Sequence, residues 1–273
     1  MTAAVLTGAG GGLGRALALR LARPGARLLL ADLLAERCEE TAELCRARGA
    51  EAHTAVVDVA DAAQVAQLGE QADRVLGRID LVVNNAGVAA SGAIGTAALD
   101  DWRWIMGINL WGVIHGCHVF VPRLIAQRAG GVLNVASAAG IACAPNMGSY
   151  NVTKAGVIAL SETLAAEVAQ HQVRVTVLCP AFFKTNLLET ARTAGVEERA
   201  MAEAAFANST TTADAVAAAA LRAVARGDLY CLPMREARVM WRIKRLMPQR
   251  FHKTLANGRL QRFARRRAAA RGL

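Results

Sequence analysis

The sequence predicts an α/β fold, a three-layer doubly wound parallel sheet with about seven strands. Short apolar runs alternate with longer amphipathic stretches over the first 232 of the 273 residues, which is the pattern of strands joined by helices. The apolar runs are too continuous for a sheet with one face in water, so helices must cover both faces. Hydrophobic residues make up 54% of the chain, which provides a large core and excludes a protein that is disordered throughout.

The elements can be assigned in order along the chain. The expected strands are the apolar segments 3–7, 27–31, 52–57, 79–84, 131–136, 173–179 and 229–232. The expected helices are the amphipathic segments 13–23, 34–48, 61–77, 100–128, 149–170 and 213–226. Asp61 and Ser149 stand at expected helix N-caps, and Gly49 follows the second helix as a C-terminal glycine does. The segment 182–212 has no strand pattern and is long for a loop, so we expect a mobile or functional insertion there.

Basic residues are concentrated at the C-terminal end. The whole chain carries a formal charge of +10, yet residues 232–273 hold thirteen Lys and Arg and one acid. Residues 1–231 are therefore slightly acidic, at −2, and the tail carries +12. This boundary predicts a Rossmann-type domain over 1–232 and a basic amphipathic extension over 233–273. An acidic body weakens the case for a nucleic-acid-binding enzyme.

The cysteines and the N-terminus point to the cytoplasm. Six cysteines are scattered without a CxxC pair or a Cys/His cluster, which argues against a disulfide scaffold and suits a reducing compartment. His115 and His118 have no partner pattern for a metal, so we expect no metal site. The chain opens directly in an apolar strand, so no signal peptide is expected. We also expect no uncharged apolar run of about 18 residues to span a bilayer.

A glycine-rich segment, Thr7–Gly14, follows the first strand and opens the first helix. Glycines are needed there because a side chain would block the tight turn and the approach of the backbone to a pyrophosphate at the helix N-terminus. This strand–turn–helix setting is that of the Rossmann dinucleotide-binding fold. The cofactor-binding residues expected in it are Gly8, Gly10, Gly11, Gly12, Leu13 and Gly14.

Asp32 ends the second strand, 18 residues beyond Gly14. A carboxylate at this place accepts hydrogen bonds from the adenosine ribose hydroxyls and repels a 2′-phosphate. No Lys or Arg occupies positions 9–13, 31 or 33. We therefore expect NAD as the cofactor, with NADP as the alternative that Arg15 and Arg37 keep open.

Tyr150 and Lys154 lie four residues apart at the start of an expected helix, and therefore on one face of it. A tyrosine has a pKa near ~10, so acting as a base near pH 7 requires a shift of about 3 units, worth roughly 4 kcal/mol. A neighbouring ammonium, a helix N-terminus and a nicotinamide can supply that shift. Ser137, thirteen residues upstream at a strand end, can donate a hydrogen bond to a substrate oxygen. Taken alone, a pair at this spacing is usually a surface pair.

Together these residues resemble the classical short-chain dehydrogenase/reductase family over about residues 3–232. The matching segments are Thr7–Gly14 (TGxxxGxG), Asp58-Val59, Asn84–Gly87 (NNAG), Asn109 in INLWG, Ser137, Tyr150–Lys154 (YxxxK) and Pro180 to Thr185. Two positions depart from the family's pattern. Ala181 stands where glycine is frequent, and Ala136 stands where a second serine often precedes the catalytic one. Neither departure touches the expected chemistry.

The resemblance implies a catalytic set of Ser137, Tyr150, Lys154 and Asn109. In it, Asn109 holds a water in a proton relay, and Lys154 also bonds the nicotinamide ribose. Tyr150 contacts the cofactor as well as the substrate. The other cofactor-binding residues that the resemblance implies are Asp58 and Val59 near the adenine, Asn85, Ala86 and Gly87 along the groove, and Pro180, Phe182 and Thr185 at the nicotinamide carboxamide.

These residues predict an oxidoreductase that moves a hydride between a nicotinamide cofactor and an alcohol or ketone, with Tyr150 as general acid and base. A nucleotide-sensing or scaffold protein that retained the fold is the alternative, and the intact catalytic set argues against it. A sugar epimerase or dehydratase expects a larger C-terminal domain. The substrate is expected to be apolar because apolar side chains follow the sixth strand. They are Phe182, Phe183, Leu187, Leu188, Met201 and Phe206.

The segments 100–128 and 149–170 carry more apolar surface than one sheet face covers, and with the family resemblance they predict a homodimer or homotetramer. In the tail, arginines at 235, 238, 242 and 245 recur at helical spacing. Apolar residues from Val239 to Met247 lie on another side, and a weaker series from Phe251 to Phe263 follows Pro248. This pattern is typical of a helix lying on the inner face of an anionic membrane. Packing on the body is the equal alternative, while nucleic acid leaves the apolar residues without a role.

Overall fold

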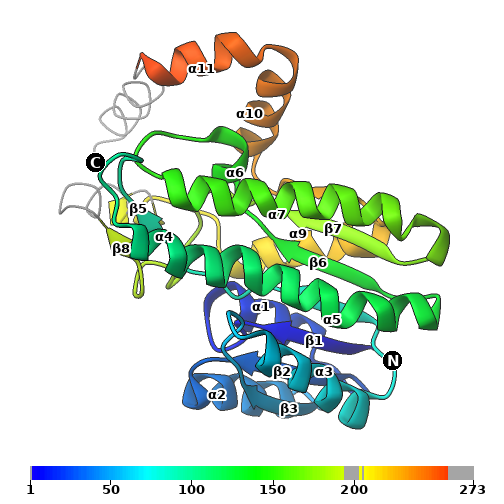
Figure 1. The fold of residues 1–273 in the computed structure, drawn as a ribbon. Coiled ribbons are helices and arrows are strands. Elements are labelled where there is room, and N and C mark those ends of the chain that lie inside the picture. The colour runs from blue at the N-terminus through cyan, green and yellow to red at the C-terminus, as the bar shows by residue number, and fades with distance from the viewer. Residues whose placement is uncertain (1, 194–202, 205, 258–273) are drawn as a thin grey trace.

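The computed structural model describes residues 2–193, 203–204 and 206–257. Its centre is a seven-stranded sheet in the order β3-β2-β1-β4-β6-β7-β9, and every neighbouring pair is parallel. The strands are β1 (Ala3–Thr7), β2 (Arg27–Asp32), β3 (Glu51–Val56), β4 (Leu81–Asn84), β6 (Gly131–Val135), β7 (Arg174–Leu178) and β9 (Tyr230–Cys231). Helices cover both faces of this sheet (Figure 1), so the predicted doubly wound α/β fold is confirmed.

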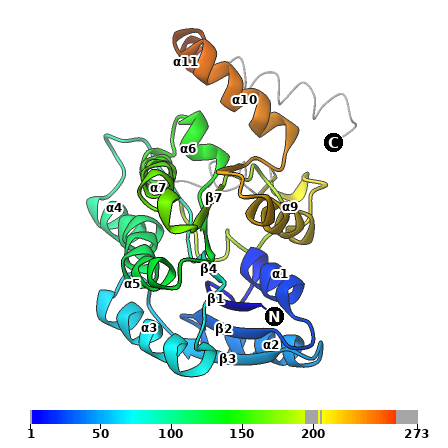
Figure 2. The same cartoon turned by 90° about the vertical axis from the view of Figure 1, so that its right-hand side faces the viewer.

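Two helical layers flank the sheet (Figure 2). One layer holds α1 (Gly12–Leu21), α2 (Ala35–Arg46) and α9 (Ala213–Arg226). The other holds α3 (Ala62–Leu76), α4 (Leu99–Met106), the π-helix η1 (Gly107–Trp111), α5 (Gly112–Gln127) and α7 (Gly148–Glu167). Smaller elements are β5 (Ala90–Ser91), α6 (Ala138–Ala142), η2 (Ala169–His171), β8 (Arg192–Thr193), α10 (Arg235–Leu246) and α11 (Pro248–Ala256).

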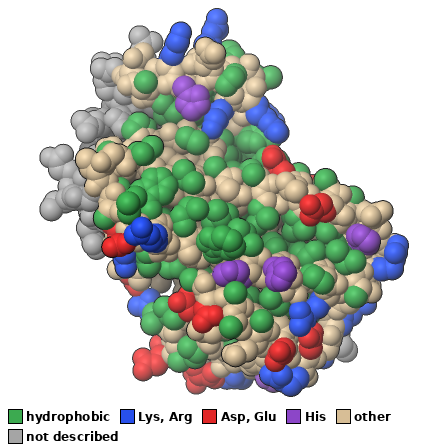
Figure 3. All heavy atoms as spheres, viewed as in Figure 1, with side chains coloured by type: hydrophobic (Ala, Val, Ile, Leu, Met, Phe, Trp, Pro, Cys, Tyr) green, Lys and Arg blue, Asp and Glu red, His purple; other side chains and the backbone are tan. Residues whose placement is uncertain are grey.

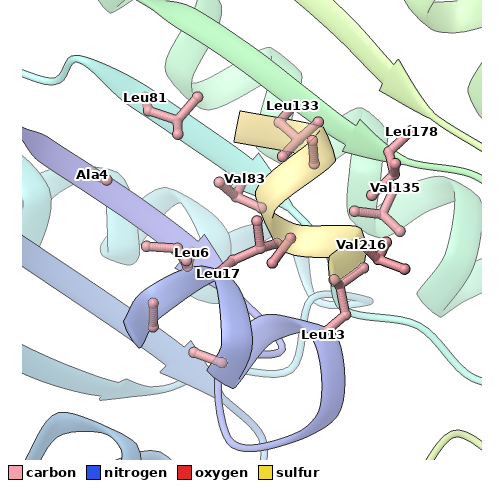
Figure 4. Close-up of a cluster of buried hydrophobic side chains, with 14 of the residues drawn as sticks. Ala4, Leu6, Leu13, Leu17, Leu81, Val83, Leu133, Val135, Leu178 and Val216 are labelled. Atoms are coloured by element: carbon pink, nitrogen blue, oxygen red, sulfur yellow. The ribbon is translucent and has the colours of Figure 1, made fainter. Parts of the chain in front are cut away.

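Each sheet face has its own hydrophobic core because successive strand side chains point to opposite faces. Leu6 and Leu133 pack against Leu17 and Val216 on the side of α1 and α9 (Figure 4). Val5, from the same strand as Leu6, belongs to the core on the side of α3, α5 and α7. The central strands β1, β4 and β6 are buried on both faces, which is why they appear as continuous apolar runs, whereas the edge strand β3 is partly exposed.

A short polar chain crosses the second core between β4, β6 and α7. Asn84 Nδ2 donates to Asn134 Oδ1 at 2.8 Å, and Asn134 Nδ2 donates to Ser161 Oγ at 3.0 Å. Ser161 Oγ donates in turn to the carbonyl of Val157 at 2.7 Å. All three polar side chains are buried, and these hydrogen bonds replace water for every group in the chain except Asn84 Oδ1, which has no partner among the described residues.

The order of the strands reverses between β1 and β4. The chain runs outward from β1 through β2 to β3 and then returns to form β4 on the other side of β1. At such a switch point, the connections that leave the two carboxyl ends diverge, and a crevice opens above the sheet. This crevice is where the candidate site lies.

The differences from the sequence prediction are local. The expected helix 100–128 is three consecutive elements, α4, η1 and α5, with five residues of π-helix in the middle. Helix α6 and the two-stranded sheet β5–β8 were not predicted, because each is too short to show a period. Part of the segment 182–212, including Met201, lies outside the described residues, as do Leu260 and Phe263 in the tail.

Within the described part of the chain, one helical stretch, Leu99–Gln127, is long and apolar enough to span a membrane by length and composition alone. The expectation that no such run exists is therefore wrong as a statement about composition. The stretch belongs to the helical layer beside the sheet, where Phe120 and Leu124 are buried in the core. Core helices of this kind pass the same test of composition.

Candidate active site

A groove of about 320 Å³ runs along the carboxyl ends of the central strands. Most of the residues expected to bind the cofactor line it together. They are Gly8, Gly10, Gly11, Leu13, Asp32, Asp58, Val59, Asn85, Ala86, Gly87, Tyr150, Lys154, Pro180 and Thr185. The predicted site residues outside this lining are Gly12, Gly14, Asn109, Ser137 and Phe182.

The glycine-rich turn after β1 has the backbone that only glycine adopts freely. Gly8 and Gly12 have φ of +65° and +50°, in the left-handed region. Gly14 has no such angle; a Cβ there would collide with the carbonyl oxygen of Gly8, so α1 packs directly on the turn. Added side chains at Gly10, Gly11 and Gly12 would fill the groove itself. The turn is therefore a cradle of bare backbone at a helix N-terminus, which suits a pyrophosphate.

Two side chains join this turn to the neighbouring strand β4. Asn85 Nδ2 donates to the carbonyls of Thr7 and Gly8 at 3.0 and 2.9 Å. Thr7 Oγ1 accepts hydrogen bonds from the backbone N–H of Asn85 and of Ala86, at 3.1 and 3.2 Å. These bonds hold the floor of the groove, with Ala86 and Gly87 along it.

Asp32 stands at the end of β2 with its carboxylate fixed by two backbone groups. Oδ2 accepts from the N–H of Gly10 at 2.8 Å, and Oδ1 accepts from the N–H of Leu34 at 3.0 Å. The nearby cations that kept NADP open are both paired. Arg15 bonds Glu40 and Thr41, and Arg37 Nη1 donates to Glu189 Oε2 at 2.8 Å.

Tyr150 and Lys154 meet on one face of α7, at the opposite end of the groove from Asp32. Lys154 Nζ donates to the carbonyl of Val135 at 3.0 Å and lies 5.8 Å from the centre of the Tyr150 ring. Both side chains are buried, at 7% exposure for Tyr150 and 4% for Lys154. Burial lowers the pKa of Lys154 to about 8. Burial therefore destabilises the charged form of Lys154, and a buried ionisable group of this kind indicates a functional position.

The Tyr150 pKa moves in the direction opposite to that expected from sequence. Burial, the largest effect, raises the pKa, and a hydrogen bond with Ser137 acts in the lowering direction. The nearby ammonium can be read from the sequence, whereas the loss of water around the phenol on folding cannot. The phenol is accordingly the protonated form in the protein alone.

Ser137 is the N-cap of α6, two residues after the end of β6. Its Oγ accepts the N–H of Ala139 at 3.1 Å and donates to the carbonyl of Pro180 at 3.4 Å. The hydroxyl is thus held by the helix start on one side and by the segment after β7 on the other. Helix α6 packs so closely on α7 that a Cβ at Gly140 would lie 2.5 Å from the carbonyl carbon of Lys154.

Asn109 is fully buried in the π-helix η1. Its Oδ1 accepts the N–H of Val88 at 2.8 Å, and its Nδ2 donates to the carbonyl of Val88 at 2.9 Å. The side chain therefore fixes the backbone just after Gly87.

The segment after β7 closes the groove from above. Thr185 Oγ1 and Asn186 Oδ1 would meet a Cβ at Gly12 at 2.7 and 2.6 Å, so both polar groups face the glycine turn. The Phe182 ring is half-exposed and packs edge-to-face on Phe206, whereas Phe183 is buried and lines the groove. Asn186 was missed in the sequence, where the only signal is its place directly after Thr185.

Comparison with known proteins places this geometry in a family. The family model for short chain dehydrogenases matches residues 2–195. The chain belongs to the short-chain dehydrogenase/reductase family. The family assignment made from sequence is confirmed, and with it the chain's class as an oxidoreductase.

Similar proteins support this family across most of the chain. A putative oxidoreductase SadH of Mycobacterium tuberculosis is 32% identical over 259 residues, covering 93% of this chain and 94% of that protein. A probable oxidoreductase EphD of the same species is 33% identical over 258 residues. That match covers 91% of this chain but 44% of EphD, so the chain spans less than half of that relative.

Among solved structures, a short-chain dehydrogenase/reductase from Burkholderia phymatum, in complex with NAD, has the same fold. It superimposes with a TM-score of 0.85 at 33% sequence identity, covering 89% of this chain and 92% of that one.

Burial of Lys154 predicts a pH dependence of stability. The unfolded chain keeps this proton up to the ordinary pKa of 10.5, whereas the folded protein releases it at about 8. Between these values the unfolded state binds more protons, so this group makes the free energy of unfolding rise with pH. The free energy of unfolding of wild type minus that of Lys154→Met should therefore rise by about 2 kcal/mol from pH 7 to pH 10.

Denaturant unfolding at a series of pH values measures that difference. Lys184→Met is the matched control, since it makes the same substitution at an exposed lysine. A flat difference for Lys154→Met would show that its ammonium is not destabilised by burial.

Proposed function

We propose that the protein is an NAD-dependent dehydrogenase or ketoreductase acting on a CH–OH group. The observation that carries this proposal is the convergence of Ser137, Tyr150 and Lys154 at one end of a groove whose other end holds Asp32. The catalytic unit is residues 1–232, and 233–273 is an extension. A nucleotide sensor that retained the fold would need neither a buried ammonium nor a phenol beside it.

The groove fits a nicotinamide dinucleotide. Bare backbone at Gly10, Gly11 and Gly12 leaves room for a pyrophosphate, and the fixed Asp32 carboxylate suits ribose hydroxyls. Asp58 and Val59 line the adenine end, while Pro180 and Thr185 line the nicotinamide end. When bound, the nicotinamide supplies the hydride acceptor or donor. The NAD complex of the Burkholderia relative supports NAD as the cofactor of this chain.

The chain's own residues handle the proton. In reduction, Tyr150 donates its phenolic proton to the carbonyl oxygen of the substrate, and burial keeps it protonated until that step. In oxidation the phenolate accepts the proton of the alcohol, so the nearby Lys154 ammonium must stabilise the negative charge. Ser137 orients the substrate oxygen by a hydrogen bond. Asn109 fixes Val88 and holds a water that returns the proton through Lys154.

The substrate is an apolar alcohol or ketone. The substrate side of the groove offers Phe183 and Leu187 after β7, and Phe182 lies at its rim packed on Phe206. Such a lining contributes burial of apolar surface and offers few charges to a sugar or a phosphorylated metabolite. An epimerase or dehydratase of a sugar nucleotide is disfavoured for the same reason.

Tyr150→Phe tests the chemistry because it removes the transferable proton and little else. We expect turnover of a carbonyl substrate to fall by about 10²- to 10⁴-fold, with the Kd for NADH unchanged. The chain has one other tyrosine, Tyr230, which bonds Glu162 away from the groove, so Tyr230→Phe is the matched control. Wild-type turnover in Tyr150→Phe would refute the mechanism.

We also propose a homodimer or homotetramer built on the helical layer of α4, α5 and α7. Hydrophobic side chains gather on the face that this layer presents to solvent (Figure 3). Trp111 is 53% exposed on it, and Val152 is also exposed. A large aromatic side chain at this exposure is typical of the centre of an interface.

Light scattering at micromolar concentration should give a multiple of the 28.7 kDa chain mass. Trp111→Glu should weaken the association by about tenfold or more, because it buries a charge at the interface. Leu44→Glu, at an exposed leucine of α2, is the control and should leave the mass unchanged. A monomeric wild type would end this proposal.

A further proposal concerns the C-terminal extension, which we infer contacts an anionic membrane peripherally on the cytoplasmic side. Helix α10 packs on the body through Ala237 and Trp241, and Lys244 Nζ donates to the carbonyl of Ile141 in α6 at 2.6 Å. These contacts support the packing alternative for this face of α10. The opposite face has its own pattern.

The outward face of α10 keeps apolar and basic side chains together. Val239, Ile243 and Leu246 are exposed, the last at 80%, and Arg235 and Arg242 are exposed beside them. Figure 2 shows α10 and α11 projecting from the end of the body beside α6. Apolar side chains that enter a bilayer, flanked by arginines for anionic headgroups, match such a surface in charge and polarity.

Vesicle co-sedimentation tests this surface. Replacing Val239, Ile243 and Leu246 together by serine should lower partitioning onto anionic vesicles by about tenfold or more, with little binding to neutral vesicles in any variant. Leu44→Ser is the control for an exposed leucine elsewhere. Point variants are preferable to removing the tail, since Trp241 packs on the body. Equal pelleting of the triple variant and wild type would end the idea.

A further inference from the structure

An ion pair bridges the two walls of the groove at its adenosine end. Arg37, on α2, and Glu189, on the segment after β7, are 152 residues apart in sequence. Arg37 Nη1 donates to Glu189 Oε2 at 2.8 Å, and both residues line the groove. The pair therefore lies where the ribose of a bound dinucleotide must face Asp32.

Arg37 is the cation placed to meet a phosphate at this end. A Cβ added at Gly10 would lie 2.9 Å from Arg37 Cβ and 2.9 Å from Asp32 Oδ2. The guanidinium therefore extends from a stem packed on the glycine turn, next to the Asp32 carboxylate. Its side chain is 44% exposed, and in the described part of the chain its hydrogen bond is to Glu189.

Arg15, the other cation nearby, is held differently. Its guanidinium donates to Thr41 Oγ1, to Glu40 and to the carbonyls of Gly10 and Arg37, so four groups fix it between α1 and α2. It cannot turn toward a ligand without giving up these bonds. Arg37 can turn toward a ligand once its hydrogen bond to Glu189 is broken.

The freedom of Arg37 to turn toward a ligand can affect the choice between NAD and NADP. NADP differs from NAD by a phosphate on the adenosine ribose, and a guanidinium is the side chain that best matches a phosphate. A free Arg37 would thus offset the repulsion by Asp32. We propose that Glu189 is a selectivity residue: it occupies the guanidinium of Arg37 and keeps it from serving a 2′-phosphate. This rests on the proposed use of a nicotinamide dinucleotide.

The charge around Arg37 supports this role. Glu189 is the strongest of three carboxylates that act on the guanidinium, and Asp32 and Glu40 are the others. The pair itself is exposed, and exposed ion pairs add little to stability. Its loss should leave the fold intact, so variants can be compared directly.

The test is the ratio of kcat/KM with NADPH to kcat/KM with NADH for one carbonyl substrate. Glu189→Gln should raise this ratio about fivefold, because one exposed counter-charge is removed from Arg37. In an Arg37→Gln background, Glu189→Gln should leave the ratio unchanged. Asp214→Asn, which breaks an exposed pair with Arg20 outside the groove lining, is the matched control and should have no effect.

Binding of adenosine fragments separates this inference from the proposed chemistry. Glu189→Gln should tighten adenosine 2′,5′-bisphosphate about fivefold by calorimetry and leave 5′-AMP unchanged. An unaltered ratio of the two Kd values in Glu189→Gln would overturn the inference. An equal gain in affinity for the bisphosphate in an Arg37→Gln background would overturn it too, because Glu189 would then repel the phosphate directly. If the fragments bind as expected but no carbonyl substrate turns over, the proposed chemistry fails and this inference stands.

Discussion

The whole site depends on how closely the turn after β1 and the turn after β4 approach each other. Asn85 and Ala86 donate four hydrogen bonds to Thr7 and Gly8 between these turns, although almost eighty residues of chain separate the two segments. The same turn opens α1, and the groove runs along it. These four hydrogen bonds therefore position the start of α1, the floor of the groove and the ends of the neighbouring strands β1 and β4. A site built on such a junction of strand ends is held by the sheet rather than by loops.

The reacting end of the groove shows two physical effects in opposition. Burial raises the pKa of Tyr150 and lowers that of Lys154, so each group is pushed toward its neutral form. The ammonium is retained by the carbonyl of Val135, a strand group that cannot move away. A dry site with one fixed backbone acceptor keeps the charge close to the phenol, where it is worth more than it would be in water. Rigid packing of α6 on α7 at Gly140 holds both helices at this spacing.

The sequence predicted structure correctly at positions where burial or backbone conformation restricts the residue type. The strands were predictable because they are buried on both faces, and the glycine turn was predictable because Gly8 and Gly12 adopt positive φ. Glu189 and Asn186 could not be found in this way. They act from irregular backbone on residues far away in the chain, and no local period marks them. In the tail, Trp241 and Leu246 both looked apolar, and only packing distinguishes the buried side from the exposed one.

The π-helix η1 has a consequence for which changes in chain length the protein can tolerate. Ile105, Asn109 and Val113 are buried at successive four-residue steps through it. In an uninterrupted α-helix each such step drifts by about 40°, so the third side chain would stand about 80° from the first. The wider turn absorbs that drift and keeps Asn109 in phase with its neighbours. Loss of a single residue from Gly107–Trp111 would rotate everything before it against everything after it, whereas the same loss in a surface loop would be local.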